Sequence, residues 1–246
     1  MAGHSKWANI KHQKARTDAR RAKVWTKLIR ELTVAARLGG PEPADNPRLR
    51  TAWDKALAAN MPKDTIERAV RRGAGGEEGA DVEELTYEGY ASGGVAILVE
   101  ALSDNRNRTV AEVRHAFARN GGNLGSDGSV AYLFARRGVV SFAPGANEDR
   151  VMEVALDAGA EDVTLEDDAS MTVLTPWEIV GDVAGALRAQ GLEPVAAEVS
   201  MVSATLVPCD EEHAVAALKL IDALEELDDV QNVYSNGDFP DSVLDA

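Results

Sequence analysis

The sequence predicts an α+β protein in which an N-terminal three-helix bundle is followed by two ferredoxin-like domains, one inserted into the other. Three observations lead to this fold class. Apolar residues recur at helical spacing before position 76, and beyond it strand-like runs alternate with helical segments. The order strand, helix, strand, strand, helix, strand then occurs twice, once uninterrupted and once around the first unit. Such units place helices on one face of an antiparallel sheet.

Residues 17–76 are expected to form the bundle. The first helix begins near Thr17 or Asp18, either of which can accept a hydrogen bond from an unpaired backbone N–H as an N-cap. The second helix has Asn46 as its N-cap, and the third follows Pro62. Because the links between these short helices are tight, they are predicted to pack on one another as a bundle.

Two nested domains are predicted to follow the bundle. Residues 80–136 and 203–240 form a split ferredoxin-like domain, and residues 137–202 form the domain inserted into it. Thr109-Val-Ala-Glu112 has the form of a capping box and predicts the start of a helix in the split domain. The strands expected in the split domain lie at 94–102, 129–134, 203–207 and 229–235.

Charge is distributed very unevenly along the chain. Residues 1–73 hold 17 Lys and Arg against 7 Asp and Glu, a net charge of +10. Residues 74–246 hold 9 and 34, a net charge of −25. A basic segment on an acidic protein points to a nucleic acid or another anionic partner for the basic part. The alternative is that the charge only keeps the protein in solution.

The basic arm at residues 1–16 is the first candidate binding site. It contains four Lys and Arg and no acid. Cations that neutralise phosphates release counterions, which gives an affinity that falls steeply as salt rises. The candidate nucleic-acid-binding residues are His4, Lys6, Trp7, Lys11, His12, Lys14, Arg16, Arg20, Arg21 and Lys23. Trp7 can stack on an unpaired base, or it can fold back onto the core of the bundle.

Asp104-Asn-Arg-Asn-Arg108 is a second candidate site, where Arg106 and Arg108 could bind an anion. These two residues are among only nine cations after position 73, and they lie beside a predicted helix N-terminus. The backbone N–H groups of a helix N-terminus favour phosphate or carboxylate groups. The alternative is that the two arginines pair with neighbouring acids such as Asp104 and Glu112.

No constellation of residues predicts catalysis. The glycine-rich stretch at 121–128 matches neither the phosphate loop nor the dinucleotide fingerprint, and the four histidines form no metal-binding pair. Cys209 and His213 are four residues apart and carry the enzyme hypothesis, but a nucleophile also needs an orienting partner and an oxyanion site. We therefore expect no catalytic residues, no metal and no cofactor.

A cytoplasmic location is expected. With one cysteine the chain can form no internal disulfide, which fits a reducing compartment. No apolar run is long enough to span a membrane, and no apolar stretch of the kind found in signal peptides follows the basic start. A transit peptide is the alternative interpretation of the arginine-rich start.

Several long motifs resemble the YebC/PmpR family. They are MAGHSKWANIKHQKA at 1–15, KLIREL at 27–32, KALAANMPKDTIERAVRRG at 55–73, YEGYASGGVAILVE at 87–100, DNRNRTVAEVRHAF at 104–117 and NGGNLGSDGSVAYLF at 120–134. Together they cover nearly the whole chain in the family's order. The sequence departs from the family pattern at Trp25, where Phe is expected, and at Ala91-Ser92, where Gly-Pro is usual.

The resemblance implies a non-catalytic, three-domain regulator of gene expression that binds nucleic acid. Two roles are attached to the family: a ribosome-associated translation factor that helps synthesis through proline runs, and a transcriptional regulator that binds promoter DNA. The implied binding positions are Lys6, Trp7, Lys11, Lys14 and their neighbours in the arm and bundle.

Electrostatics favours the ribosome as the partner. A long duplex would be repelled by a body of charge −25, whereas a slender basic arm suits a groove in ribosomal RNA. DNA is the alternative partner, and a further alternative makes the two ferredoxin-like units small-ligand sensors or protein-docking surfaces.

Overall fold

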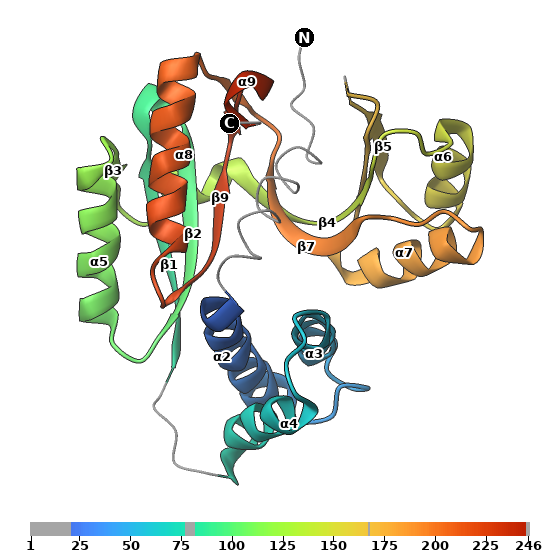
Figure 1. The fold of residues 1–246 in the computed structure, drawn as a ribbon, viewed down its shortest axis with the longest axis horizontal. Helices are drawn as coiled ribbons and strands as arrows, with labels where there is room; N and C mark the ends of the chain where they lie inside the picture. The colour runs from blue at the N-terminus through green and yellow to red at the C-terminus, as the bar shows by residue number, and fades with distance from the viewer. Residues whose placement is uncertain (1–20, 77–81, 167, 245–246) are drawn as a thin grey trace.

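The computed structural model describes residues 21–76, 82–166 and 168–244 (Figure 1). Within these residues the chain has a mixed helix and sheet fold with two four-stranded antiparallel sheets, which confirms the predicted α+β class. Figure 1 shows a group of helices next to two sheets, each of which has its own pair of covering helices. We call residues 21–76 the bundle and residues 82–244 the body.

The bundle contains α2 (Arg21–Gly39), α3 (Pro47–Ala58) and α4 (Lys63–Arg71). Asn46 caps α3 as predicted, because its side-chain oxygen accepts a hydrogen bond from the backbone N–H of Leu49 at 3.0 Å. The amide group of Asn46 also donates to the carbonyl of Ala35 at 2.8 Å, which ties α3 to α2. The predicted start at Thr17 or Asp18 lies outside the described residues.

Apolar side chains from all three helices form the core of the bundle. Its buried members are Leu32, Ala35, Ala36, Leu49, Ala52, Ala56, Met61, Ile66, Ala69 and Val70. The indole N–H of Trp25 donates to the carbonyl of Ala59 at 3.1 Å, so this large ring satisfies its polar atom while it packs on the core. A π-helical turn, Arg72–Gly76, continues from α4.

The first sheet has the order β3-β1-β2-β9 and is antiparallel throughout. Its strands are β3 (Asn123–Leu124), β1 (Glu83–Tyr90), β2 (Ala96–Ser103) and β9 (Val230–Ser235). Figure 1 shows α5 (Arg106–Arg119) and α8 (Glu211–Glu225) on the same face of this sheet. Phe117, Leu220 and Ile97 are fully buried between the helices and the strands.

Three expectations for this part of the chain are wrong. The strand β1 was not expected, since its sequence EELTYEGY is acidic and only part of it is buried. Residues 129–133 do not form a strand: Ala131–Leu133 form a 3₁₀ turn, and only Phe134 lies in a strand, as the first residue of β4 (Phe134–Phe142). Residues 203–207 are not one strand either, because β7 (Ala196–Ser203) ends at the first of them. The short β8 (Val207–Pro208) pairs in parallel with β10 (Gly237–Asp238).

The expected helix start at Thr109 is also wrong, because α5 begins three residues earlier. Asn105 is the N-cap, and its side chain accepts a hydrogen bond from the backbone N–H of Arg108 at 3.0 Å. Thr109 therefore lies one turn inside the helix, fully buried. Its hydroxyl donates to the carboxylate of Asp229 at 2.6 Å.

The second sheet has the order β5-β6-β4-β7 and is also antiparallel. Its strands are β4 (Phe134–Phe142), β5 (Asp162–Leu165), β6 (Met171–Thr175) and β7 (Ala196–Ser203), with α6 (Glu148–Asp157) and α7 (Val180–Ala189) against it. The chain order from β4 to β7 is the one expected for the inserted domain. The strands of this sheet extend beyond the predicted bounds of 137–202, since β4 begins at Phe134 and β7 ends at Ser203. The division of the chain into domains remains our interpretation.

A small apolar cluster joins the two sheets. Ala96 and Leu98 from β2 pack with Val130 and Phe134, and Met201 from β7 is packed against them. Figure 1 shows β4 and β7 curving from the second sheet toward the first. The short remaining elements are η2 (Ser92–Gly94), η4 (Trp177–Ile179) and α9 (Asp241–Leu244). In the described part of the chain, no helix has the length and apolar character needed to cross a membrane.

Candidate nucleic-acid interface

The predicted basic arm falls outside the described residues. This applies to His4, Lys6, Trp7, Lys11, His12, Lys14, Arg16 and Arg20. Arg21 and Lys23 belong to the first turn of α2, and their side chains also lie outside the description. These assignments therefore stay predictions, and the described part of the interface is the bundle that follows the arm.

The bundle is itself basic. Residues 21–73 hold 12 Lys and Arg against 6 Asp and Glu. The side chains of Arg68, Arg71 and Arg72 are exposed, while Ile66, Ala69 and Val70 are buried. Among the described residues, none of these three arginines forms an ion pair, so their charges are available to a partner. Arg68 and Arg71 lie on α4, and Arg72 is the first residue of the turn that follows it; we call these three residues the α4 cations.

The sequence prediction missed the α4 cations. The spacing i, i+3, i+4 places three residues on one side of a helix, and this could have revealed them. Lys63 and Glu67 lie on the same helix, but the ion pair between them is long at 3.7 Å and exposed. A pair of that kind contributes little to stability.

Other cations of the bundle are used inside the protein. Arg48 on α3 makes a two-pronged ion pair with Glu31 on α2, with N···O distances of 2.7 and 3.1 Å. The same guanidinium pairs with Glu84 on β1 at 2.5 Å. Lys27, Arg30 and Arg37 also contact acceptors on the body. We call Lys27, Arg30, Arg37 and Arg48 the docking cations.

The structure gives the two arginines of the 104–108 motif different surroundings. The guanidinium of Arg108 contacts the carboxylates of Asp229 at 2.7 Å and Asp104 at 2.8 Å. Hydrogen bonds to Asp229 and then Asp104 raise the pKa of Arg108 above its ordinary value. Arg106 is exposed in the first turn of α5. Of the acids that the alternative interpretation named, Asp104 pairs with Arg108, whereas the buried partner Asp229 was not anticipated. The anion site remains a prediction.

Asp229 is the buried centre of this motif, with only 2% of its side chain exposed. One carboxylate oxygen accepts hydrogen bonds from Ser103 at 2.9 Å, from Thr109 at 2.6 Å and from Arg108. Burial alone would raise the pKa of this carboxyl group. The three hydrogen bonds and the charge of Arg30 outweigh burial and hold the pKa below its ordinary value.

A second buried carboxylate, Glu88 on β1, organises the glycine-rich loop before β4. It accepts backbone N–H bonds from Gly128, Val130 and Ala131, each at 2.7 Å. Burial would raise the pKa of Glu88, but these bonds outweigh it and lower the pKa. Because the N–H groups of Val130 and Ala131 point to the carboxylate, they cannot join a strand ladder. This explains why the expected strand at 129–134 does not form.

The geometry around Cys209 does not support the enzyme hypothesis. Burial raises the pKa of its thiol, so the reactive thiolate is disfavoured. The thiol contacts the carbonyl of Val207 at 3.4 Å, and Nδ1 of His213 contacts the carboxylate of Asp210 at 2.7 Å. Each group thus has another partner. In the described ranges, no cluster of three or more His, Cys, Asp or Glu could hold a metal ion.

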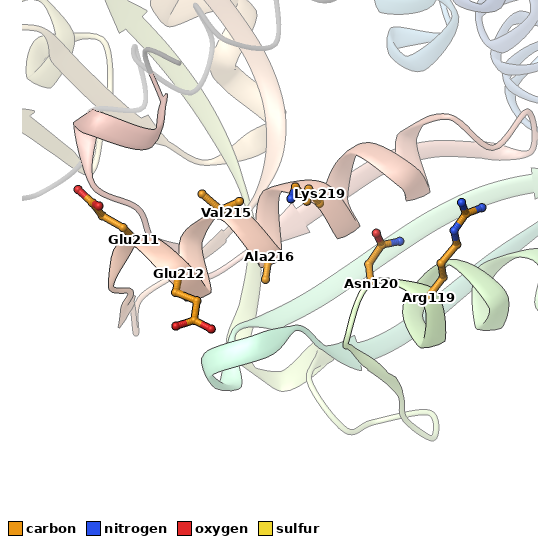
Figure 2. Close-up of a pocket in the computed structure, with 7 residues that line it drawn as sticks. All are labelled: Arg119, Asn120, Glu211, Glu212, Val215, Ala216 and Lys219. Carbon is orange, nitrogen blue, oxygen red and sulfur yellow. The ribbon is translucent and has the colours of Figure 1, made fainter.

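A groove of about 630 Å³ lies between α8 and the C-terminal end of α5. Its lining residues are Arg119, Asn120, Glu211, Glu212, Val215, Ala216 and Lys219. Figure 2 shows Glu211 and Glu212 together at one end of the groove, with Arg119 far from them. Because the groove is open and is lined by both basic and acidic side chains, its lining does not indicate a class of ligand.

The fold and the charge pattern define a class of protein: an α+β protein with a basic N-terminal helical bundle and two antiparallel sheets. The model of the TACO1/YebC protein N-terminal domain matches residues 5–76, and that of the TACO1/YebC second and third domain matches residues 82–237. The chain belongs to the TACO1/YebC family, which confirms the resemblance found in the sequence.

Relatives with curated names are similar over their whole length. A "Probable transcriptional regulatory protein" from Hahella chejuensis is 62% identical over 246 residues, which is 100% of this chain and 99% of that protein. "Transcriptional regulatory protein PmpR" from Pseudomonas aeruginosa is 61% identical over 244 residues, 99% of this chain and 98% of that protein. The family is thus named for transcriptional regulation, and no enzyme activity appears in these names.

A solved structure has the same overall arrangement. The crystal structure of a conserved hypothetical protein, Aq1575, from Aquifex aeolicus is 48% identical in sequence, with a TM-score of 0.83. The match covers 96% of this chain and 98% of that one. The arrangement of helices and sheets therefore agrees with an experimental structure over nearly the full length.

Proposed function

We propose that this protein is a non-catalytic regulator of gene expression that binds nucleic acid through its basic arm and bundle. One observation carries the proposal: the α4 cations are exposed and have no acidic partner among the described residues, although the chain as a whole has a charge of −15. Exposed cations without acidic partners can neutralise phosphates and release counterions, so a polyphosphate is the kind of partner that suits them.

We further propose that the partner is ribosomal RNA and that the protein helps synthesis through proline runs, as the family resemblance implies. The acidic body supports RNA, since its charge repels a long duplex that lies across it. A compact RNA fold can contact the arm and bundle while it avoids the body. The predicted arm residues and the α4 cations would then bind phosphates together.

Promoter DNA is the second candidate partner. The names of the relatives favour it, because PmpR and other relatives are called transcriptional regulatory proteins. Cosedimentation of the protein with ribosomes, combined with a genome-wide map of DNA crosslinks, distinguishes the two. Enrichment on ribosomes with no DNA peaks supports the translation role, and the reverse result supports transcription.

A charge-matched pair of variants tests the binding surface. The first variant changes Arg68, Arg71 and Arg72 to Ala; the control changes three exposed body cations, Arg114, Arg119 and Arg188, to Ala. Both variants lose three positive charges, so a general effect of net charge would appear in both. We expect only the first to bind RNA more weakly, with a salt slope reduced by about one for each phosphate that is no longer bound. Equal weakening in both variants would refute this surface.

A further inference from the structure

The bundle is attached to the body by polar bonds rather than by a shared core. The apolar clusters of the bundle and of the first sheet have no member in common among the described residues. The docking cations all come from the bundle, and their acceptors are carbonyls and carboxylates of the body. An interface of this kind lets two parts move unless specific bonds hold them.

Arg30 is the docking cation with the most buried partner. Its Nη1 atom donates to the carboxylate of Asp229 at 2.6 Å and to the carbonyl of Asp228 at 2.6 Å. The carbonyl of Leu102 lies 3.4 Å from the same atom. Lys27, one turn earlier, donates to the carbonyl of Glu225 at 2.9 Å. Figure 1 shows this end of α2 beneath the turn between α8 and β9.

The body holds Asp229 ready for this contact. The three donors on Ser103, Thr109 and Arg108 bind one carboxylate oxygen, and Arg30 binds the other. The backbone carbonyl of Asp229 also accepts a hydrogen bond from the N–H of Leu102 at 2.8 Å. The carboxylate is therefore fixed in position by the body alone, and the bundle adds only the last partner.

The ion pair between Arg48 and Glu84 is a weaker contact between bundle and body than the pair between Arg30 and Asp229. Arg48 and Glu84 are 36% and 53% exposed, so salt screens the attraction between them. The Asp229 carboxylate is almost fully buried, and its attraction to Arg30 is screened much less. Of these two ion pairs, the one between Arg30 and Asp229 therefore contributes more to the orientation of the bundle.

We propose that Arg30 and Asp229 are positioning residues, which set the orientation of the nucleic-acid-binding bundle on the body. Arg108, from the 104–108 motif, pairs with the same carboxylate from within the body, so it does not itself connect the bundle to the body. The consequence for binding rests on the proposed function, but the docking itself does not.

The test compares the two arginines that share the same carboxylate. Arg30→Ala removes the partner on the bundle, and Arg108→Ala removes a partner within the body. Spin labels on Leu57→Cys in α3 and Val215→Cys in α8, with Cys209→Ser, report the distance between bundle and body; both labelled positions are exposed. We expect a narrow distance distribution in the parent and in Arg108→Ala, and a broad one in Arg30→Ala.

An unchanged distribution in Arg30→Ala would overturn the proposal. If Arg30→Ala does not fold, Asp229→Asn provides the same measurement from the other side of the contact. It removes the charge that attracts Arg30 while the shape of the side chain is kept. A narrow, parent-like distribution in a folded Asp229→Asn protein would likewise overturn it.

Nucleic-acid binding by the same variants separates this inference from the proposed function. If binding needs the docked bundle, Arg30→Ala lowers affinity in proportion to the docked fraction, about tenfold when about one molecule in ten is docked. The salt slope stays unchanged, because every phosphate is still bound. A slope reduced by about one would show that Arg30 itself contacts phosphate, and this would overturn its positioning role. If the parent binds no nucleic acid, the proposed function fails while the distance results still stand.

Discussion

Two buried carboxylates, Glu88 and Asp229, explain much of the local structure of the body. Burying a charged carboxylate without hydrogen bonds would cost free energy. Each of these two accepts hydrogen bonds from donors in segments distant in sequence. Sequence patterns identified neither residue, because an acid in an acidic chain carries no sign of burial. The carboxylate of Asp229 and its partner Arg30 are 199 positions apart.

The role of Glu88 can be tested by Glu88→Gln. A glutamine keeps the size of the side chain but presents an N–H₂ group to backbone N–H donors that need an acceptor. Because hydrogen bonds to a charged acceptor contribute about 1.5–3 kcal/mol each, we expect a loss of unfolding free energy of at least about 2 kcal/mol. Amide exchange should rise first at Gly128, Val130 and Ala131.

The exposed Glu83, on the same strand, provides the control for Glu88. Glu83→Gln should change neither stability nor amide exchange in the loop. Equal effects from both changes would show that strand charge, rather than the buried acceptor, controls the loop.

Asp229 should make stability depend on pH in a defined direction. Its folded pKa is lower than its ordinary value, so its contribution is fully present above the unfolded pKa of about 3.9. The contribution is lost as the pH falls through the folded pKa. We expect Asp229→Asn to cost about 3 kcal/mol near neutral pH, as for loss of one partner of a buried ion pair.

The pH series is measured by denaturant unfolding of the parent and of Asp229→Asn. The difference between the two should be constant above about pH 5 and should shrink in more acidic solution. A difference that grows as the pH falls would contradict the assigned direction of the pKa shift.

At the scale of elements, helices were easier to predict than strands. The apolar spacing and the Asn46 cap predicted the helices α2, α3 and α4, because both signals are local. The strand β1 escaped prediction because its residues are acidic and its pairing with β2 and β3 comes from elsewhere in the chain. The α4 cations gave no clear signal in the sequence, because Asp64 and Glu67 lie on the same helix.

The separate core of the bundle predicts that it can unfold independently. Ile66 on α4 is fully buried in that core. Ile66→Ala should cost about 2–5 kcal/mol, and the cost should fall on the bundle alone. Trp25 and Trp53, which pack on this core, should report an earlier fluorescence transition, while the far-ultraviolet signal of the sheets remains.

Val151, fully buried in the core of the second sheet, is the matched control. Val151→Ala should leave the tryptophan transition of the bundle where it is in the parent and destabilise the second sheet. A single transition that shifts equally in both variants would show that bundle and body unfold as one unit.

At the scale of the whole molecule, the sequence shows that positive charge is concentrated before position 73 and negative charge after it. It does not show which of the cations face solvent. Four bundle cations, the docking cations, are bonded to the body. The cations that remain exposed on α4 belong to a module held on one side of the acidic body. The orientation of that module decides how closely a polyanion approaches the acids.

This arrangement predicts that remote acids discriminate between long and short nucleic acids. Asp157, Glu178 and Asp182 are exposed acids of the second sheet's helices and turn. Changing them to Asn, Gln and Asn reduces the net charge from −15 to −12. A long duplex that reaches the body should then bind more tightly at low salt, by up to about tenfold, while a short RNA hairpin should bind as before. At 0.15 M salt the Debye length is about 8 Å, so the gain should disappear.

Fluorescence anisotropy titrations of the duplex and the hairpin across a salt series measure these affinities. An equal gain for hairpin and duplex that persists at high salt would mean that the acids act locally, and that the body does not exclude long duplexes by its charge.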